Sequence, residues 1–213
     1  MARDHLVWDW NGTLLDDLSL VVSSTNAAFA AIGGPEVDAD SHRRSFRRPI
    51  AEYYGEVLGR VVDAHEFQRL DEVFHEAYRV GLTSCSLAAD ATAAIKAWPG
   101  DQSLLSMWFH AELVPAVESY GLNGLFARVD GLQAAVGGGF KAGHLAAHLA
   151  ELGVAGERAV LIGDSLDDAH AADAVGAAVV LYTGGFTDPE RLRASGYPAA
   201  DTLVEAVELA TTL

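Results

Sequence analysis

The sequence is poor in residues that characterise several common classes of protein. It contains a single cysteine, Cys85, so an intramolecular disulfide framework is excluded and a reducing compartment is expected. Lysine and arginine together number 14 against 30 aspartate and glutamate residues, which gives a formal net charge of −16. Nucleic acids and anionic membranes bind basic surfaces, so we expect neither as a partner.

Long apolar runs are also lacking. No stretch approaches the roughly 20 apolar residues of a membrane-spanning helix. The chain reaches the charged residue Asp9 too early to contain a secretory signal peptide. Of the 213 residues 50% are nevertheless hydrophobic, enough for a substantial core. We therefore expect a soluble, cytoplasmic, globular protein.

What the sequence does contain is an alternation of short apolar runs, turns and helical patterns. The expected strands are residues 6–9, 103–108, 125–129, 159–164 and 178–182, and helical patterns follow at 142–152, 168–175 and 201–213. This alternation predicts an α/β fold with a parallel sheet. Ligands of such sheets bind beyond the carboxyl ends of the strands, so polar residues at these ends should converge.

The long segment between the first two expected strands has little strand character. Helical patterns cover residues 18–32, 49–58, 64–80 and 87–98. Hinges are expected near residues 15–17 and 83–90. We therefore predict a core of residues 1–15 and 91–213, with a helical cap of residues 16–90 inserted into it.

Four fragments carry polar groups at strand ends or helix starts. They are Asp9-Trp10-Asn11-Gly12-Thr13, Ser106, Gly137-Gly138-Gly139-Phe140-Lys141 and Gly163-Asp164-Ser165-Leu166-Asp167-Asp168. Each alone has an ordinary structural explanation, such as a polar turn, a surface charge or a helix cap. However, the chain has only two lysines, and one of them, Lys141, falls at a helix start. The four fragments in this order indicate a phosphoryl-transfer site.

The catalytic candidates fit defined roles in that chemistry. Asp9 is placed to be the nucleophile and to form an aspartyl-phosphate, which divides a difficult hydrolysis into two easier steps. Asp9 and Asp164 together can bind Mg²⁺, which prefers oxygen ligands. Ser106 can donate its hydroxyl to a phosphate oxygen, and Lys141 supplies positive charge to the nucleophile and the phosphoryl group.

The neighbouring residues of these fragments are candidates for binding and support. The turn at Gly12 and Thr13 can direct backbone N–H groups at a phosphate, so both are candidate substrate ligands. Asp168 is expected to support the loop or the lysine, and Asp167 could do either.

The order of these fragments resembles the haloacid dehalogenase (HAD) superfamily, whose usual pattern is Asp-x-Asp-Gly-Thr, then Ser/Thr, then Lys, then Gly-Asp-x-x-x-Asp. Three further segments are similar to its phosphoglycolate-phosphatase-like members: Leu14-Leu15-Asp16-Asp17, Val129-Asp130-Gly131 and Thr183-Gly184-Gly185-Phe186. The resemblance implies a Rossmann-like core, a helical cap, Mg²⁺ dependence and a small phosphorylated substrate. It also implies a metal ligand from the backbone carbonyl of Asn11.

Asn11 is also the point where the sequence departs from this pattern. In phosphatases of the family, an aspartate at this position protonates the leaving group and then deprotonates the attacking water. An amide can do neither, and loss of a general acid/base costs about 10²–10⁴ in rate. We expect a phosphatase with a reduced acid/base, or one substituted by a group such as His110. The alternative is a catalytically weak phospholigand-binding or regulatory protein. Either could be a monomer or a homodimer.

Arginines are concentrated in the expected cap, at Arg43-Arg44-Ser45-Phe46-Arg47-Arg48. Arginine binds carboxylates and phosphates through paired hydrogen bonds, so Arg44, Arg47 and Arg48 are candidate substrate ligands. A solvated helix face would explain them equally well.

Two other reactions catalysed within this superfamily fit the sequence less well. Dehalogenases lack the acidic loop that contains Asp164, and phosphonoacetaldehyde hydrolases need a cap lysine, which residues 16–94 do not contain.

Several aromatic and histidine residues have ordinary interpretations. His144 and His148 are four residues apart, and we expect an exposed helix face rather than a metal pair. Trp8 is expected in the core, whereas Trp10 is expected to line the entrance of the site. Trp108 is expected to pack in the core or against the cap.

Overall fold

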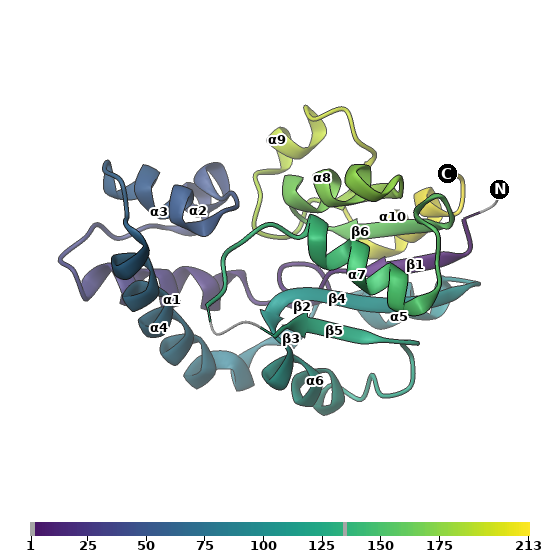
Figure 1. The fold of residues 1–213 in the computed structure, drawn as a ribbon, viewed down its shortest axis with the longest axis horizontal. Coiled ribbons are helices and arrows are strands. Elements are labelled where there is room, and N and C mark those ends of the chain that lie inside the picture. The colour runs from purple at the N-terminus through teal and green to yellow at the C-terminus, as the bar shows by residue number, and fades with distance from the viewer. Residues whose placement is uncertain (1–2, 134–135) are drawn as a thin grey trace.

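A six-stranded parallel sheet forms the centre of the computed structural model, which describes residues 3–133 and 136–213 (Figure 1). Residues 1–2 and 134–135, within the expected core, lie outside the described residues. Across the sheet the strands are β5 (Val129–Leu132), β4 (Asp101–Phe109), β1 (His5–Trp8), β6 (Ala159–Gly163), β7 (Ala178–Tyr182) and β8 (Ala199–Ala200). All neighbours pair in parallel. The α/β class and the Rossmann-like strand order are thereby confirmed.

Helices cover both faces of the sheet. One group is α5 (Ala91–Ala97), α6 (His110–Ser119) and α10 (Leu203–Ala210), and the other is α7 (Ala142–Leu152), α8 (Leu166–Val175) and α9 (Pro189–Arg193). Leu6 and Trp8 of β1 belong to the cluster of the first group, whereas Val7 belongs to that of the second. Because side chains alternate along a strand and both faces are covered, β1 is a continuous apolar run.

A separate set of helices, which does not cover the sheet, lies beyond the carboxyl ends of the strands (Figure 1). It consists of α1 (Leu18–Ala30), α2 (Ala39–Ser45), α3 (Ile50–Leu58) and α4 (Ala64–Gly81), followed by the 3₁₀ turn Leu82–Ser84. The short strands β2 (Leu15–Asp16) and β3 (Ser86–Leu87) pair antiparallel, where the chain leaves the sheet and returns to it. In the part of the chain that is described, no helix combines the length and apolarity needed to span a bilayer.

Two of the expected elements differ from the structure. The strand expected at 125–129 lies later, at β5, because turns with positive φ at Gly121 and Gly124 delay the start of pairing. The helix expected over 87–98 begins only at Ala91, because Leu87 pairs with Leu15 in the antiparallel ribbon. Helices α2, α6 and α9 were not expected, and α6 contains Pro115.

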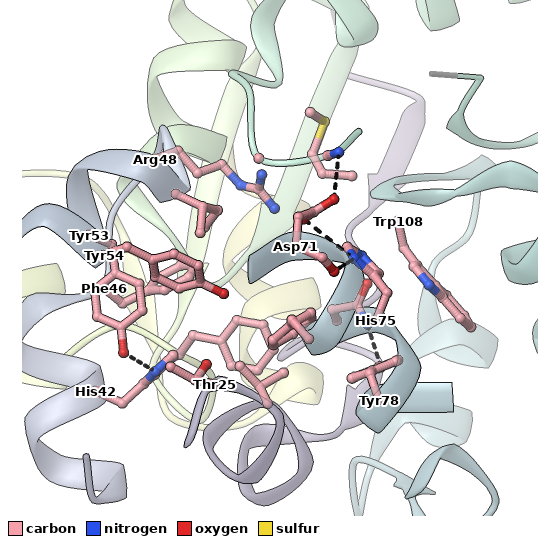
Figure 2. Close-up of a pocket in the computed structure, with 18 residues that line it drawn as sticks. Thr25, His42, Phe46, Arg48, Tyr53, Tyr54, Asp71, His75, Tyr78 and Trp108 are labelled. Atoms are coloured by element: carbon pink, nitrogen blue, oxygen red, sulfur yellow. Dashed lines mark hydrogen bonds and ion pairs between the residues drawn. The ribbon is translucent and has the colours of Figure 1, made fainter. Parts of the chain in front are cut away.

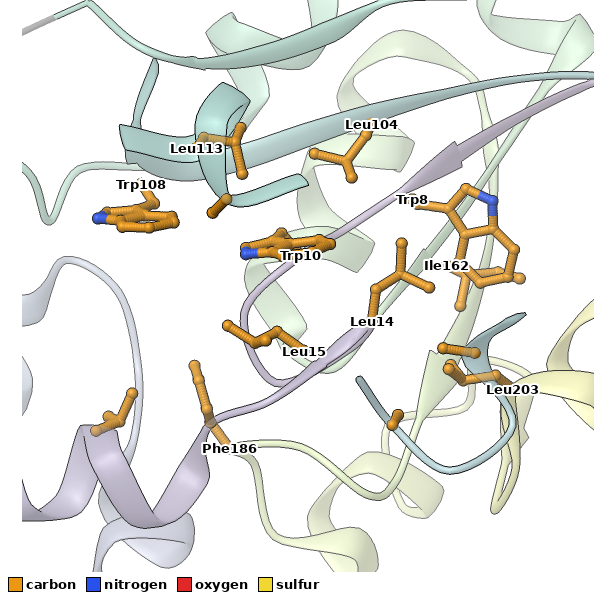
Figure 3. Packing of buried hydrophobic residues seen from close by; sticks show 14 of the residues in the cluster. Trp8, Trp10, Leu14, Leu15, Leu104, Trp108, Leu113, Ile162, Phe186 and Leu203 are labelled. Atoms are coloured by element: carbon orange, nitrogen blue, oxygen red, sulfur yellow. The ribbon is translucent and has the colours of Figure 1, made fainter. Parts of the chain in front are cut away.

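Trp10 does not line the entrance of the site, as the sequence led us to expect. Its ring is fully buried in the same cluster as Trp8, beside Leu14 and Leu15 (Figure 3). The ring of Tyr120 meets it edge-on, with centroids 5.8 Å apart. Residues two apart on an extended chain project to the same side, so Trp10 follows Trp8 into the core.

His148 is likewise not exposed. It is buried, and its Nδ1 lies 2.7 Å from Asp130 Oδ2 while its Nε2 lies 2.8 Å from Ser103 Oγ. Because a carboxylate only accepts, Nδ1 carries the proton and Nε2 accepts from Ser103, whose oxygen accepts in turn from His5 Nε2 at 2.8 Å. This chain of bonds joins α7 to β4, β5 and β1. His144, one turn earlier, is exposed as expected.

We predict that His148→Gln makes stability less dependent on pH. Burial is the main cause that lowers the pKa of His148 below its usual 6.5, so the ring is neutral in the fold. Below pH 6.5 the unfolded chain binds more protons at this position, and the contribution of His148 to stability falls as pH falls. In urea unfolding between pH 7.5 and 5, the free energy of unfolding of the wild type should exceed that of His148→Gln by about 1–3 kcal/mol at neutral pH. This difference should shrink as the pH falls. His144→Gln is the control, and an equal pH trend for it would contradict the prediction.

Candidate active site

The site lies at the carboxyl ends of β1 and β6, which are neighbours in the sheet. Asp9 directly follows β1, and its N–H donates to the carbonyl of Ile162 in β6 at 2.9 Å. Asp164 directly follows β6. The strand order reverses at this point, since the chain continues from β1 to β4 on one side and reaches β6 on the other only later. Such a reversal opens a crevice for ligands. The sequence-based expectation of convergence is met for both carboxylates.

Lys141 is a buried member of the same site and not a surface charge. It precedes α7, and its Nζ lies 2.5 Å from Asp9 Oδ1 and also contacts Asp168 Oδ1. The other carboxylate oxygen of Asp168 accepts from the backbone N–H and hydroxyl of Ser165, at 3.0 and 2.6 Å, and so caps α8. Asp167 Oδ2 accepts from the Lys141 N–H at 3.0 Å. Asp167 and Asp168 therefore both contact Lys141, at its backbone and at its ammonium group.

Burial and mutual repulsion shape the titration of this cluster. Burial raises the pKa of Asp9 to about 6, although Lys141 opposes the shift. Burial and the nearby charges of Asp9 and Asp168 raise the pKa of Asp164 well above its usual range. Burial opposes the charge of Lys141, but Asp168 and Asp9 outweigh it and raise the lysine pKa. The site is therefore rich in negative charge, and one lysine does not balance it.

The donor set fits a hard divalent cation. Carboxylate oxygens of Asp9, Asp164 and Asp168 all lie within 4.8 Å of one another. All are oxygen ligands, the type that Mg²⁺ prefers. The Asp168 oxygens are already bound by Lys141 and Ser165, which leaves Asp9 and Asp164 as the pair for a metal. A dication there would offset the excess negative charge.

The loop after Asp9 is held by its glycine. Gly12 has a φ of 72°, and a Cβ at this position would lie 2.6 Å from Asp164 Oδ2. The Gly12 N–H donates to Asp17 Oδ1 at 2.8 Å, and the Thr13 N–H donates to the Trp10 carbonyl at 3.2 Å. Both N–H groups are thus used inside the loop, contrary to the expectation that they face a phosphate. The Thr13 hydroxyl lies 3.4 Å from Asp9 Oδ2.

Asn11 is paired at both ends of its amide. Its Oδ1 accepts from Ser106 Oγ at 3.1 Å, and its Nδ2 donates to Asp17 Oδ2 at 2.9 Å and to the Tyr78 hydroxyl at 2.8 Å. The Tyr78 hydroxyl also donates to Asp17 Oδ2 at 2.6 Å. Sequence reasoning missed both Asp17 and Tyr78. Asp17 lies in a segment that resembles the family, but no signal in the sequence links Tyr78 to Asn11, 67 positions away.

The expected arginine ligands separate into three different environments. Arg48 lines a cavity of about 30 Å³ together with the catalytic candidates Asp9, Asn11, Ser106, Lys141 and Asp164. Arg47 pairs with Glu56, and Arg44 is exposed and donates to Ser41 Oγ at 3.1 Å. Only Arg48 of the three therefore adjoins the catalytic candidates. The candidate proton donor His110 accepts from the Gly131 N–H at 3.2 Å and does not line this cavity.

Comparisons of sequence and of fold both find similarity to hydrolases and phosphatases. A family model described as HAD-hydrolase-like matches residues 140–209. A phosphoglycolate phosphatase of Mesorhizobium japonicum is 27% identical over 195 residues, which cover 88% of this chain and 86% of that protein. The fold is shared with a haloacid dehalogenase-like family hydrolase of Streptococcus pneumoniae (TM-score 0.81, 17% identity, 97% of each chain). It is also shared with a protein of Clostridium acetobutylicum described as a predicted phosphatase (TM-score 0.87, 16% identity, 100% of each chain).

The chain is therefore similar to HAD-like proteins in sequence at residues 140–209, and similar to HAD-like hydrolases in fold. The four fragments that resemble this family meet at one edge of the sheet, around one cavity. The amide at position 11, which the carboxylate of Asp17 binds, is the departure from the usual pattern of that family.

We predict that Lys141→Met destabilises the fold at neutral pH by about 3–5 kcal/mol, because two buried carboxylates, those of Asp9 and Asp168, lose their ammonium partner. The loss should shrink as pH falls toward 5. Carboxylates with raised pKa values take up protons in the fold before they do so in the unfolded chain, so acid favours the folded variant. Lys96→Met replaces the other lysine, which is exposed, and should change stability by less than about 0.5 kcal/mol. Urea unfolding at several pH values tests this, and similar losses in the two variants would contradict it.

Proposed function

We propose that this HAD-like chain is a Mg²⁺-dependent phosphatase that acts on a small phosphorylated metabolite. In this proposal residues 1–15 and 91–213 form the catalytic core, and residues 16–90 form a cap over it. The observation that carries the proposal is the 2.5 Å contact of Lys141 Nζ with Asp9 Oδ1, beside Asp164 and Ser106. The named activity of the Mesorhizobium japonicum relative supports phosphate-ester hydrolysis.

In the first step a carboxylate oxygen of Asp9 attacks phosphorus, and the bond from phosphorus to the ester oxygen breaks. The ester oxygen leaves with the bonding electrons and takes a proton from solvent water to give the product alcohol, and the phosphoryl group remains as an aspartyl-phosphate on Asp9. In the second step water attacks this phosphorus and releases inorganic phosphate, which regenerates the carboxylate. Lys141 holds the Asp9 carboxylate and faces the transferred group with positive charge, and Ser106 can turn its hydroxyl from Asn11 to a phosphate oxygen.

Asp9, Asp164 and the backbone carbonyl of Asn11 are the proposed metal ligands. Bound Mg²⁺ supplies positive charge that lowers the repulsion between a carboxylate and a phosphate dianion. Phe186 orients one of these ligands, because its backbone N–H donates to Asp164 Oδ2 at 2.5 Å. The close approach needs Gly185, where any side chain would collide with Asp164 and with the Gly12 carbonyl.

Proton transfer is the weak step of this site. The Asn11 amide carries no transferable proton at neutral pH, and its two N–H bonds are directed to Asp17 and Tyr78. Leaving groups that depart without a proton, such as the acetate of acetyl phosphate, should therefore react faster than alkyl esters. The same pairing favours a second candidate function, a phospholigand-binding or regulatory protein with little turnover.

The first test of the proposal is hydrolysis of acetyl phosphate with and without Mg²⁺. We expect turnover that is lost on chelation, restored by Mg²⁺, and reduced at least about 1,000-fold in Asp9→Asn, which removes the nucleophile. Asp101→Asn, a change of an exposed aspartate at the start of β4, should keep wild-type activity. Mg²⁺-dependent binding of inorganic phosphate without turnover would instead support the binding protein. Activity that survives Asp9→Asn would contradict the mechanism.

The second test moves the acid to the position of Asn11. Burial raises the pKa of Asp17 to about 6, and its Oδ2 lies 2.9 Å from Asn11 Nδ2, so Asn11→Asp alone places two carboxylates side by side. The exchange Asn11→Asp with Asp17→Asn preserves the donor between them. We expect the double variant to hydrolyse β-glycerophosphate at least about 100-fold faster than wild type, and faster than Asn11→Asp. Steady-state kcat values decide this. No gain in the double variant would show that a missing acid at position 11 does not limit the rate.

A further inference from the structure

A second and larger cavity adjoins the proposed phosphoryl site. It measures about 100 Å³, of the same order as the roughly 150 Å³ protein cavities that bind benzene (Figure 2). Asn11, Phe46, Arg48, Met107 and Phe186 line both this cavity and the smaller one that contains Asp9 and Lys141. A phosphate ester bound at Asp9 would therefore extend its alcohol portion into the larger cavity.

The wall of this cavity is built mainly of aromatic rings. Tyr53 and Tyr54 come from α3, Phe74 and Tyr78 from α4, and Trp108 from β4 (Figure 2). The rings pack against one another in several geometries: Tyr78 and Trp108 meet edge-to-face with centroids 5.6 Å apart, and Phe74 and Tyr78 are stacked with centroids 5.9 Å apart. Burial of a flat apolar group against a wall of this kind is favourable, whereas a small anionic group gains nothing from the negative faces of the rings.

Two buried nitrogen atoms of the same wall have no hydrogen-bond partner among the described residues. They are His42 Nε2 and Trp108 Nε1. His42 Nδ1 is bound to the Tyr53 hydroxyl at 2.8 Å, and burial lowers the pKa of His42 to about 4, so the ring is neutral. The Trp108 nitrogen can only donate. Unpaired buried polar groups cost about 1–3 kcal/mol each, so a ligand with a polar atom on its body would recover part of this.

The charges around the cavity disfavour an alcohol that carries a carboxylate. Asp71 lines the wall, and its carboxylate accepts from the Gly137 N–H at 3.4 Å and lies 3.3 Å from His75 Nδ1, which is bound to the Asp71 backbone carbonyl at 2.7 Å. Arg48 is the one arginine or lysine in the wall as described, and its Nε lies 3.8 Å from Asp167 Oδ2. Its charge is therefore partly balanced before any ligand enters. A ligand carboxylate would meet Asp71 and an aromatic surface without a free cation.

We propose that the substrate is a phosphate ester of an uncharged alcohol bearing a ring, and not a carboxylate-bearing ester such as phosphoglycolate. This inference rests on the proposed function, since it assigns the larger cavity to the leaving group of the same site. The aromatic wall supplies affinity for the ring, and Asp71 supplies discrimination against a second negative group.

Binding of two unreactive phosphonates tests the inference without requiring turnover. Phenethylphosphonate and 3-phosphonopropionate replace the ester oxygen of benzyl phosphate and of phosphoglycolate by carbon, and differ from each other only in the ring and the carboxylate. In isothermal titration with Mg²⁺ present, we expect phenethylphosphonate to bind at least about tenfold more tightly, as burial of a ring provides. Equal binding, or tighter binding of 3-phosphonopropionate, would overturn the inference.

The matched esters separate this inference from the proposed function. Benzyl phosphate and phosphoglycolate share the step at phosphorus, so the ratio of their kcat/KM values reports the cavity. A ratio of at least about ten in favour of benzyl phosphate supports the inference. Faster hydrolysis of phosphoglycolate overturns it and keeps the phosphatase proposal. Tight phenethylphosphonate binding with no hydrolysis of either ester or of acetyl phosphate keeps the cavity assignment and rejects the phosphatase.

Two variants locate the binding energy in this cavity. Val21→Phe places a ring in the cavity from α1. It should lower the ratio of the affinities for phenethylphosphonate and 3-phosphonopropionate by at least about tenfold. Val80→Phe adds the same side chain on α4, where Val80 is 80% exposed, and should keep the preference. If Val21→Phe fails to fold, Trp108→Phe keeps a ring in the wall while removing its N–H, and a shift in phosphonate affinity then reports contact with that wall. An undiminished preference in the folded variants would place the ligand elsewhere and overturn the inference.

Discussion

The contact of Lys141 with Asp9 and Asp168 is the interaction on which the rest of the site depends. An ammonium group is buried between two carboxylates, and a third, Asp164, lies beside them. A buried charge cluster is stable only when its geometry is held from several sides. Here β1 positions Asp9, α8 positions Asp168 through its cap, and the start of α7 positions Lys141. Strand β1 and the helices α7 and α8 therefore hold the charged groups of the site in place.

The second constraint is the position of the amide of Asn11. Tyr78 of α4 and Asp17 at the start of α1 both bind its nitrogen, so helices outside the sheet fix a side chain next to the nucleophile. A second link runs through Arg43 of α2, whose guanidinium donates to the carbonyls of Gly184 and Gly185. These neighbour Phe186, whose N–H holds Asp164. A movement of helices α1, α2 and α4 would thus displace two of the proposed metal-binding residues, Asn11 and Asp164.

The same helices give the region beyond the nucleophile its chemical character. Their rings form an aromatic wall, and the Asp71 carboxylate and the guanidinium of Arg48, which lies near Asp167, line the same cavity. In the proposed function the charged cluster at the strand ends would contact only the phosphate group that all phosphate esters share. The aromatic wall would contact the alcohol portion that differs between them, so the strand ends would carry the reaction and the helices would select the substrate.

Local patterns predicted the parallel α/β fold and the convergence of Asp9, Asp164, Lys141 and Ser106. These positions follow from strand ends and helix starts, and in a parallel sheet such ends share one edge whatever the detailed packing. Boundaries were less well predicted: the strand expected at 125–129 lies at Val129–Leu132, because glycine turns delayed the pairing.

The amino-acid sequence by itself therefore determined the class of fold, the resemblance to a family and the four polar fragments of the site. Only the tertiary structure decided that Tyr78 binds Asn11, that His148 and Trp10 are buried, and that His42 and Trp108 face one cavity. The physical reason is that these contacts join segments far apart in the chain. Their distances depend on how whole helices pack, and no periodicity or short motif encodes that packing.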